Sequence, residues 1–94
     1  MTVLSDDEVR SALADLEGWE QAGGEIVREV RFDTFPEAVA FVVRVGFVAE
    51  SADHHPDLDV RYNKVRVALS THSEGGITDK DVDLARAIQA LAGR

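Results

Sequence analysis

Three Ser/Thr-x-x-acid patterns, beginning at Ser5, Thr34 and Thr78, predict where the helices of this chain start. In such a capping box, the first hydroxyl accepts a hydrogen bond from a free backbone N–H, and the acid three residues later reaches back to the cap residue. Apolar residues recur at three- and four-residue spacing after each pattern, which predicts amphipathic helices. We expect the first helix to stop at Gly18 and the second to run to about Ala52.

The segments between these helices have the features of β-strands. Gly23-Gly24 predicts a hairpin turn between two strands, Trp19–Ala22 and Glu25–Phe32. Lys64–Ser70 alternates apolar and polar residues, as a half-buried strand does, and a short strand is expected at Leu58–Arg61. The predicted order is α-β-β-α-β-β-α. This order favours an α+β fold, with a four-stranded antiparallel sheet and three helices packed on one face.

The predicted second helix is apolar around most of its circumference. Its main stripe is expected to consist of Phe35, Ala38, Val39, Val42, Val45 and Ala49, and further apolar residues are Phe41, Val43, Phe47 and Val48. Such a helix fits burial on two sides, and a subunit interface is the simplest second burial site. The 94 residues form one domain, residues 1–94, and a cysteine-free domain of this size is expected to gain stability by self-association.

Charge and hydropathy exclude several classes of function. The formal net charge is −8 and the basic residues are scattered along the sequence, so we expect no direct nucleic-acid binding. No apolar run approaches the roughly 20 residues that cross a bilayer, and no secretory signal is seen at the N-terminus. The sequence therefore predicts a soluble, cytoplasmic protein without membrane contact.

All three histidines, His54, His55 and His72, lie within 19 residues, with Glu50 and Asp81 to either side. Histidine gives and takes protons near neutral pH, so several in one cleft indicate general acid–base chemistry. Structural roles stay open, because a histidine at a helix end can simply favour the helix dipole and Asp81 has a capping role. A zinc site is disfavoured, since consecutive helical residues point about 100° apart and no i, i+4 histidine pair is present.

The spacing of these residues resembles the signature of the pterin-4a-carbinolamine dehydratases, a family that in animals includes a dimerisation cofactor of a homeodomain factor. The pattern reads Glu50, three residues, His54-His55-Pro56, five residues, Tyr62, nine residues, His72, eight residues, Asp81. Other matching segments, from Trp19 to Gly76-Ile77-Thr78, extend the resemblance over essentially the whole chain. One departure is Asp57-Leu58-Asp59, where animal members commonly have aromatic residues.

The resemblance implies a hydro-lyase that converts 4a-hydroxytetrahydropterin to quinonoid dihydropterin without a metal or organic cofactor. By position, His54 and His72 resemble the acid–base pair, His55 an orienting residue and Glu50 a supporting carboxylate, while Asp81 would fix an imidazole. The positions that resemble pterin contacts are Asp53, His54, His55, Ser70, Thr71, His72 and Ser73. The resemblance also implies a homodimer or homotetramer. The alternative is a non-catalytic binding module on the same fold, acting as a coactivator or assembly chaperone.

Overall fold

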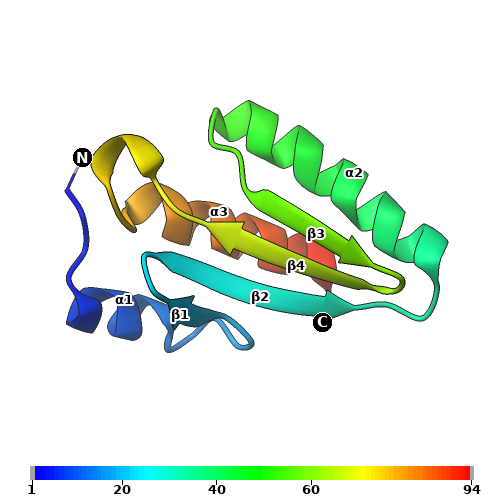
Figure 1. The fold of residues 1–94 in the computed structure, drawn as a ribbon, viewed down its shortest axis with the longest axis horizontal. Helices are drawn as coiled ribbons and strands as arrows, with labels where there is room; N and C mark the ends of the chain where they lie inside the picture. The colour runs from blue at the N-terminus through cyan, green and yellow to red at the C-terminus, as the bar shows by residue number, and fades with distance from the viewer. Residues whose placement is uncertain (1, 94) are drawn as a thin grey trace.

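A computed structural model describes residues 2–93 of the chain (Figure 1). Its elements are α1 (Asp6–Leu13), β1 (Glu20–Ala22), β2 (Glu25–Arg31), α2 (Phe35–Ala52), β3 (Asp57–Arg61), β4 (Lys64–Leu69), the 3-10 turn η1 (His72–Glu74) and α3 (Asp79–Ala92). The strands form one antiparallel sheet in the order β1-β2-β4-β3. The predicted α+β fold, with the order α-β-β-α-β-β-α, is confirmed.

The helices begin where the sequence predicts. Ser5 and Thr78 form complete capping boxes with Glu8 and Asp81. At Thr34 the box is altered: the hydroxyl accepts from the Glu37 N–H, but the Glu37 carboxylate accepts from the hydroxyl rather than from the backbone of Thr34. These caps satisfy N–H groups that have no partner inside their own helices.

One helix end differs from the prediction. α1 ends at Leu13 instead of continuing to Gly18. Two tight turns follow, in which the N–H groups of Leu16 and Trp19 each bond to the carbonyl three residues earlier, and both side chains are buried. α2 ends at Ala52, as predicted, and Asp53 follows in the left-handed conformation, with φ 51°. His54 and His55 therefore lie beyond the helix.

The core lies between the inner face of the sheet and the helices. Strands β2 and β4 pair so that Val30 lies opposite Val65 and Ile26 opposite Leu69, and all four side chains are buried. The Phe41 ring of α2 packs against Phe32, with ring centroids 5.1 Å apart. The buried set depends on this register, because a one-residue shift of the pairing would turn all of these side chains to the other face of the sheet.

Arg28 interrupts the apolar inner face of β2. It lies opposite Val67 and donates to the Gln89 side-chain oxygen on α3, which also accepts from Trp19 Nε1 at 3.0 Å. Burial lowers the pKa of the Arg28 guanidinium, and Glu17 opposes this by its charge. One amide oxygen therefore joins β2, the segment before β1, and α3.

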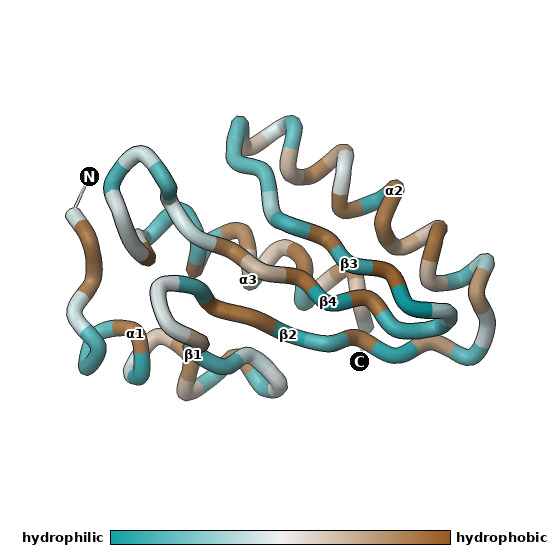
Figure 2. The backbone as a smooth tube through the Cα atoms, in the orientation of Figure 1, coloured by the Kyte–Doolittle hydropathy of each residue, from teal (hydrophilic) through white to brown (hydrophobic). Residues whose placement is uncertain are grey.

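The buried stripe of α2 differs from the predicted one. Its buried residues are Ala38, Phe41, Val45 and Ala49. Phe35 and Val39, expected in the core, are 49% and 39% exposed, and with Val43 and Phe47 they form a second apolar stripe, here called the α2 outer face. Figure 2 shows hydrophobic segments along α2. Within residues 2–93, no helix combines the length and apolar character needed to span a bilayer.

We predict that Phe41→Ala destabilises the protein by about 3–5 kcal/mol, because it removes a fully buried ring and leaves a cavity between α2 and Phe32. Tyr62→Ala is the control. This aromatic side chain is 68% exposed, so its loss should change the free energy of unfolding by less than about 0.5 kcal/mol. Urea denaturation followed by circular dichroism measures both, and equal effects would contradict the assigned core.

Candidate functional site

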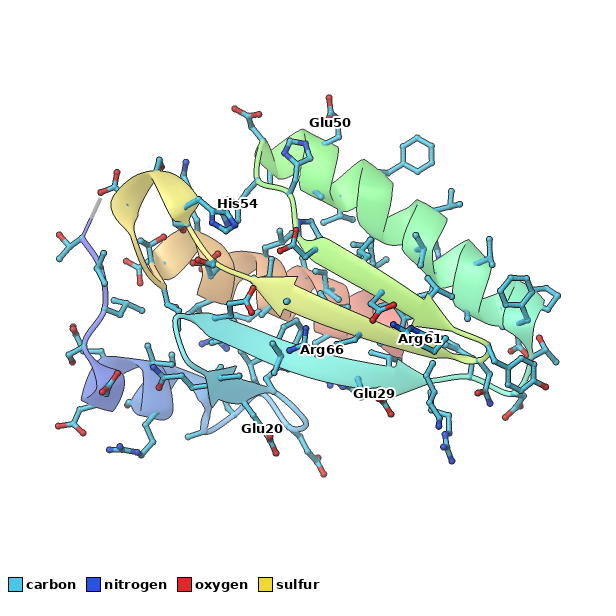
Figure 3. The ribbon with its side chains drawn as sticks, viewed as in Figure 1. Glu20, Glu29, Glu50, His54, Arg61 and Arg66 are labelled. Atoms are coloured by element: carbon cyan, nitrogen blue, oxygen red, sulfur yellow. The ribbon has the colours of Figure 1, made fainter. Side chains whose placement is uncertain are left out.

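The end of α2 separates the two adjacent histidines. After the left-handed turn at Asp53, the His54 N–H bonds to the Ala49 carbonyl at 3.1 Å. The His54 side chain is only 11% exposed, whereas that of His55 is 61% exposed. Figure 3 shows His54 pointing toward the loop between β4 and α3, and Glu50 near the end of α2. Consecutive residues therefore have one sheltered and one solvated imidazole.

His54 is held by Asp81, a fully buried carboxylate at the start of α3. The distance between His54 Nε2 and Asp81 Oδ1 is 2.5 Å. The other carboxylate oxygen, Oδ2, accepts from the Thr78 N–H at 2.9 Å and the Thr71 hydroxyl at 2.8 Å. Three donors and the N-terminus of α3 all favour a negative charge at this point. Asp81 thus caps its helix and contacts the imidazole of His54.

His55 has a different carboxylate partner. Its Nε2 lies 2.9 Å from Oε1 of Glu50, which belongs to the last turn of α2. Both side chains are mostly exposed, and ion pairs in such surroundings contribute about 0–1 kcal/mol. The pair therefore biases the orientation of His55 without fixing it.

The loop after β4 carries the third histidine into the same region. Thr71 and Gly76 form an isolated antiparallel bridge that closes the loop around η1, which begins at His72. A surface hollow, here called the histidine hollow, lies between this loop and the end of α2. Its lining residues are Asp53, His54, His55, Ser70, Thr71, His72, Ser73 and Lys80.

The structure brings together all of the residues proposed from sequence to contact a pterin. Glu50 and Asp81 complete the candidate set as partners of His55 and His54 rather than as lining residues. Lys80 was missed by sequence reasoning. The available signal was its place directly before Asp81 at the start of α3, which brings it to the same edge of the hollow.

The two adjacent imidazoles do not converge on one point. The Nε2 atoms of His54 and His55 face different carboxylates, on α3 and α2. Both histidines lie just beyond the end of α2 at Ala52. Among residues 2–93, no three His, Asp or Glu side chains are arranged as a group that could hold a metal ion.

The fold and the histidine hollow define a class of protein: a small α+β domain with a hydrogen-bonded histidine–carboxylate site beside its sheet. Residues 2–91 match the model of the family described as pterin 4 alpha carbinolamine dehydratase. The chain belongs to this family. A protein of Mycolicibacterium vanbaalenii, named provisionally as a pterin-4-alpha-carbinolamine dehydratase, is 53% identical over 99% of this chain and 100% of its own length.

Other relatives also support membership of this family. A Chloroflexus aurantiacus protein with the same provisional name is 50% identical over 99% of this chain and 100% of its own length. A crystal structure from Brucella melitensis, described as a transcriptional coactivator/pterin dehydratase, has a TM-score of 0.93 and 38% identity, covering 98% of this chain and 100% of that one. A pterin dehydratase-like RuBisCO assembly factor of the alpha-carboxysome shares the fold, with a TM-score of 0.69, 20% identity, and 82% and 92% of the two chains covered.

We predict that Asp81→Asn lowers the free energy of unfolding by about 1–3 kcal/mol, because the amide NH₂ cannot accept one of the hydrogen bonds now made to the buried carboxylate. Asp83→Asn, an exposed change on the same helix, is the matched control and should have little effect. Thermal and urea unfolding measure the difference. Equal stabilities of the two variants would show that the Asp81 contacts contribute nothing to the folded state.

Proposed function

We propose that this protein catalyses the loss of water from a 4a-hydroxytetrahydropterin, giving quinonoid dihydropterin. One observation carries the proposal: His54, which follows α2, and His72, which follows β4, line a single hollow in which His54 is held by a buried carboxylate. Membership of the pterin-4a-carbinolamine dehydratase family and the names of the bacterial relatives support the same reaction.

The proposed reaction needs two positioned proton transfers. Hydroxide is a poor leaving group, so an acid protonates the 4a-oxygen as its bond to carbon breaks and water departs. A base takes the proton lost from a pterin ring nitrogen as the carbon–nitrogen double bond forms. Each positioned transfer contributes about 10²–10⁴ in rate. Two imidazoles in one hollow suit this pair of tasks, because each exchanges protons near neutral pH.

We assign His54 and His72 as the acid–base pair. Asp81 accepts from His54 Nε2, which leaves Nδ1 as the ring nitrogen that can exchange a proton with the substrate. His55 orients the pterin and Glu50 supports His55. Asp53, Ser70 and Ser73 are proposed to contact the pterin ring, since they line the same hollow.

We also propose that the protein is a homodimer or homotetramer in solution. The α2 outer face consists of Phe35, Val39, Val43 and Phe47, which follow one another at four-residue spacing, and Phe47 is 75% exposed. Four large apolar side chains on one helix face form a surface that a second helix can cover. The same face on another copy is a self-complementary partner, as two-fold symmetry requires.

A non-catalytic binding role is the second candidate function. The Brucella melitensis protein is described both as a transcriptional coactivator and as a pterin dehydratase, and the α2 outer face offers apolar surface on which a different protein could dock. A pure scaffold has no need of three histidines in one hollow. The kinetic experiment that follows therefore separates the two candidates.

We predict that the wild type accelerates dehydration of freshly generated 4a-hydroxytetrahydropterin, followed by ultraviolet absorbance. His54→Ala and His72→Ala should each lower kcat by about 10²–10⁴-fold, because each removes one proton-transfer group. Glu74→Ala is the control, since this exposed residue lies in η1 with His72 but does not line the hollow. A wild type no faster than the spontaneous reaction would refute the enzyme proposal and favour the binding role.

We predict that Phe47→Glu shifts the protein toward monomer, because it places a charge within a proposed apolar interface. Tyr62→Glu is the control, since Tyr62 is also a largely exposed aromatic residue but lies at the β3–β4 turn. Sedimentation velocity gives the molecular mass of each form. A monomeric wild type, or the same assembly for Phe47→Glu as for wild type, would exclude association through the α2 outer face.

A further inference from the structure

Thr71 lines the histidine hollow, yet its hydroxyl does not face it. The residue is 5% exposed, and Oγ1 lies 2.8 Å from both Asp81 Oδ2 and Thr78 Oγ1, which belong to the start of α3. The resemblance implies a pterin contact for Thr71. The structure instead directs this side chain inward, toward the carboxylate that holds His54.

The hydrogen bonds around Thr71 have only one consistent direction. A carboxylate without a proton can only accept, so the single hydroxyl proton of Thr71 goes to Asp81. The contact between the two threonine hydroxyls must then be donated by Thr78. The Thr78 oxygen in turn accepts from the Lys80 N–H at 3.3 Å. The result is a directed series of hydrogen bonds from the backbone of α3, through both hydroxyls, to Asp81.

This series of hydrogen bonds decides which oxygen of the Asp81 carboxylate meets each partner. Oδ2 is occupied by the Thr71 hydroxyl and the Thr78 N–H, which leaves Oδ1 for His54. Within residues 2–93, no buried side-chain nitrogen or oxygen lacks a hydrogen-bond partner. A fully satisfied buried network of this kind holds its members in one arrangement.

The backbone of Thr71 holds the loop that carries His72. Its N–H donates to the Gly76 carbonyl at 2.9 Å, and its own carbonyl accepts from the N–H groups of Glu74 and Gly75, both at 3.0 Å. His72 is the next residue along the chain and the first of η1. Thr71 therefore connects the two histidines. Its side chain reaches His54 through Asp81, and its backbone holds the loop that carries His72.

We infer that Thr71 is a positioning residue for the acid–base pair: its hydroxyl orients Asp81 and thereby His54, while its backbone fixes the loop of His72. This inference rests on the proposed function in assigning both histidines to catalysis. The orientation of His54 by Thr71 and Asp81 does not depend on the proposed function. The positioning role and the proposed function can therefore fail separately.

Thr71→Val isolates the role of the hydroxyl. Valine has nearly the same shape as threonine, so the backbone bonds of the loop should remain. The substitution removes one donor from Asp81 Oδ2 and leaves the Thr78 hydroxyl without its acceptor. The carboxylate is then no longer restricted to one orientation, and His54 follows it. Thr71→Ser restores the hydroxyl and serves as the rescue variant.

The kinetic test separates positioning from substrate contact. We expect Thr71→Val to lower kcat by roughly 10- to 100-fold, as a small misplacement of a reacting group does, with KM changed by less than about twofold. Thr71→Ser should keep most of the wild-type kcat. A raised KM with unchanged kcat would show that Thr71 contacts the pterin directly, and the inference would be overturned.

A second measurement is independent of activity. Nitrogen-15 NMR of the imidazole side chains reports which ring nitrogen carries the proton. Wild type, Thr71→Ser and the exposed control Thr2→Val should show His54 protonated at Nε2, and Thr71→Val should show a mixture of tautomers. If the NMR signals change as expected but the wild type has no dehydratase activity, the role of Thr71 in orienting His54 stands and the proposed function fails. An unchanged His54 signal in Thr71→Val would overturn the inference.

Discussion

The site depends on one buried negative charge, the Asp81 carboxylate. Burying an ionised group is costly unless hydrogen bonds and opposite partial charges replace its water. Here the replacement comes from three parts of the chain: the N-terminus of α3, the segment after β4 through Thr71, and the segment after α2 through His54. Because the carboxylate needs all three, it holds these segments together at one point.

The same residue serves the fold and the site because a capping acid must lie at the third helical position. The capping box fixes Asp81 relative to Thr78, and the N-terminus of α3 in turn lies against the segment that follows β4. The capping geometry at the start of α3 therefore sets the position of the carboxylate that holds His54. The buried side of the hollow thus combines the backbone geometry of a helix start with the hydroxyls of Thr71 and Thr78.

Local rules explain what the sequence predicted well. The helix starts follow from hydroxyls placed three residues before acids, and the inner face of β4 follows from alternation along the strand. The predictions fail where tertiary contacts, rather than local sequence, determine where a helix ends or which side chains are buried. Leu16 and Trp19 reach the core through turns rather than through a longer α1. On α2 apolar residues surround most of the circumference, so the pattern alone could not choose between Phe35 and Phe41. The inward direction of the Thr71 hydroxyl depends on its contact with α3, which no periodic pattern encodes.

His54 and His55 show how neighbouring residues acquire different roles. The left-handed turn at Asp53 sends one imidazole to a buried carboxylate and leaves the other in solvent beside Glu50. Glu50 also borders a notch on α2 with Val43, Gly46 and Phe47, and two of these residues belong to the α2 outer face. A second copy covering that face would shield Glu50 from water, and a shielded ion pair is stronger than a solvated one. Self-association would then orient His55 from one side of the hollow while Asp81 orients His54 from the other.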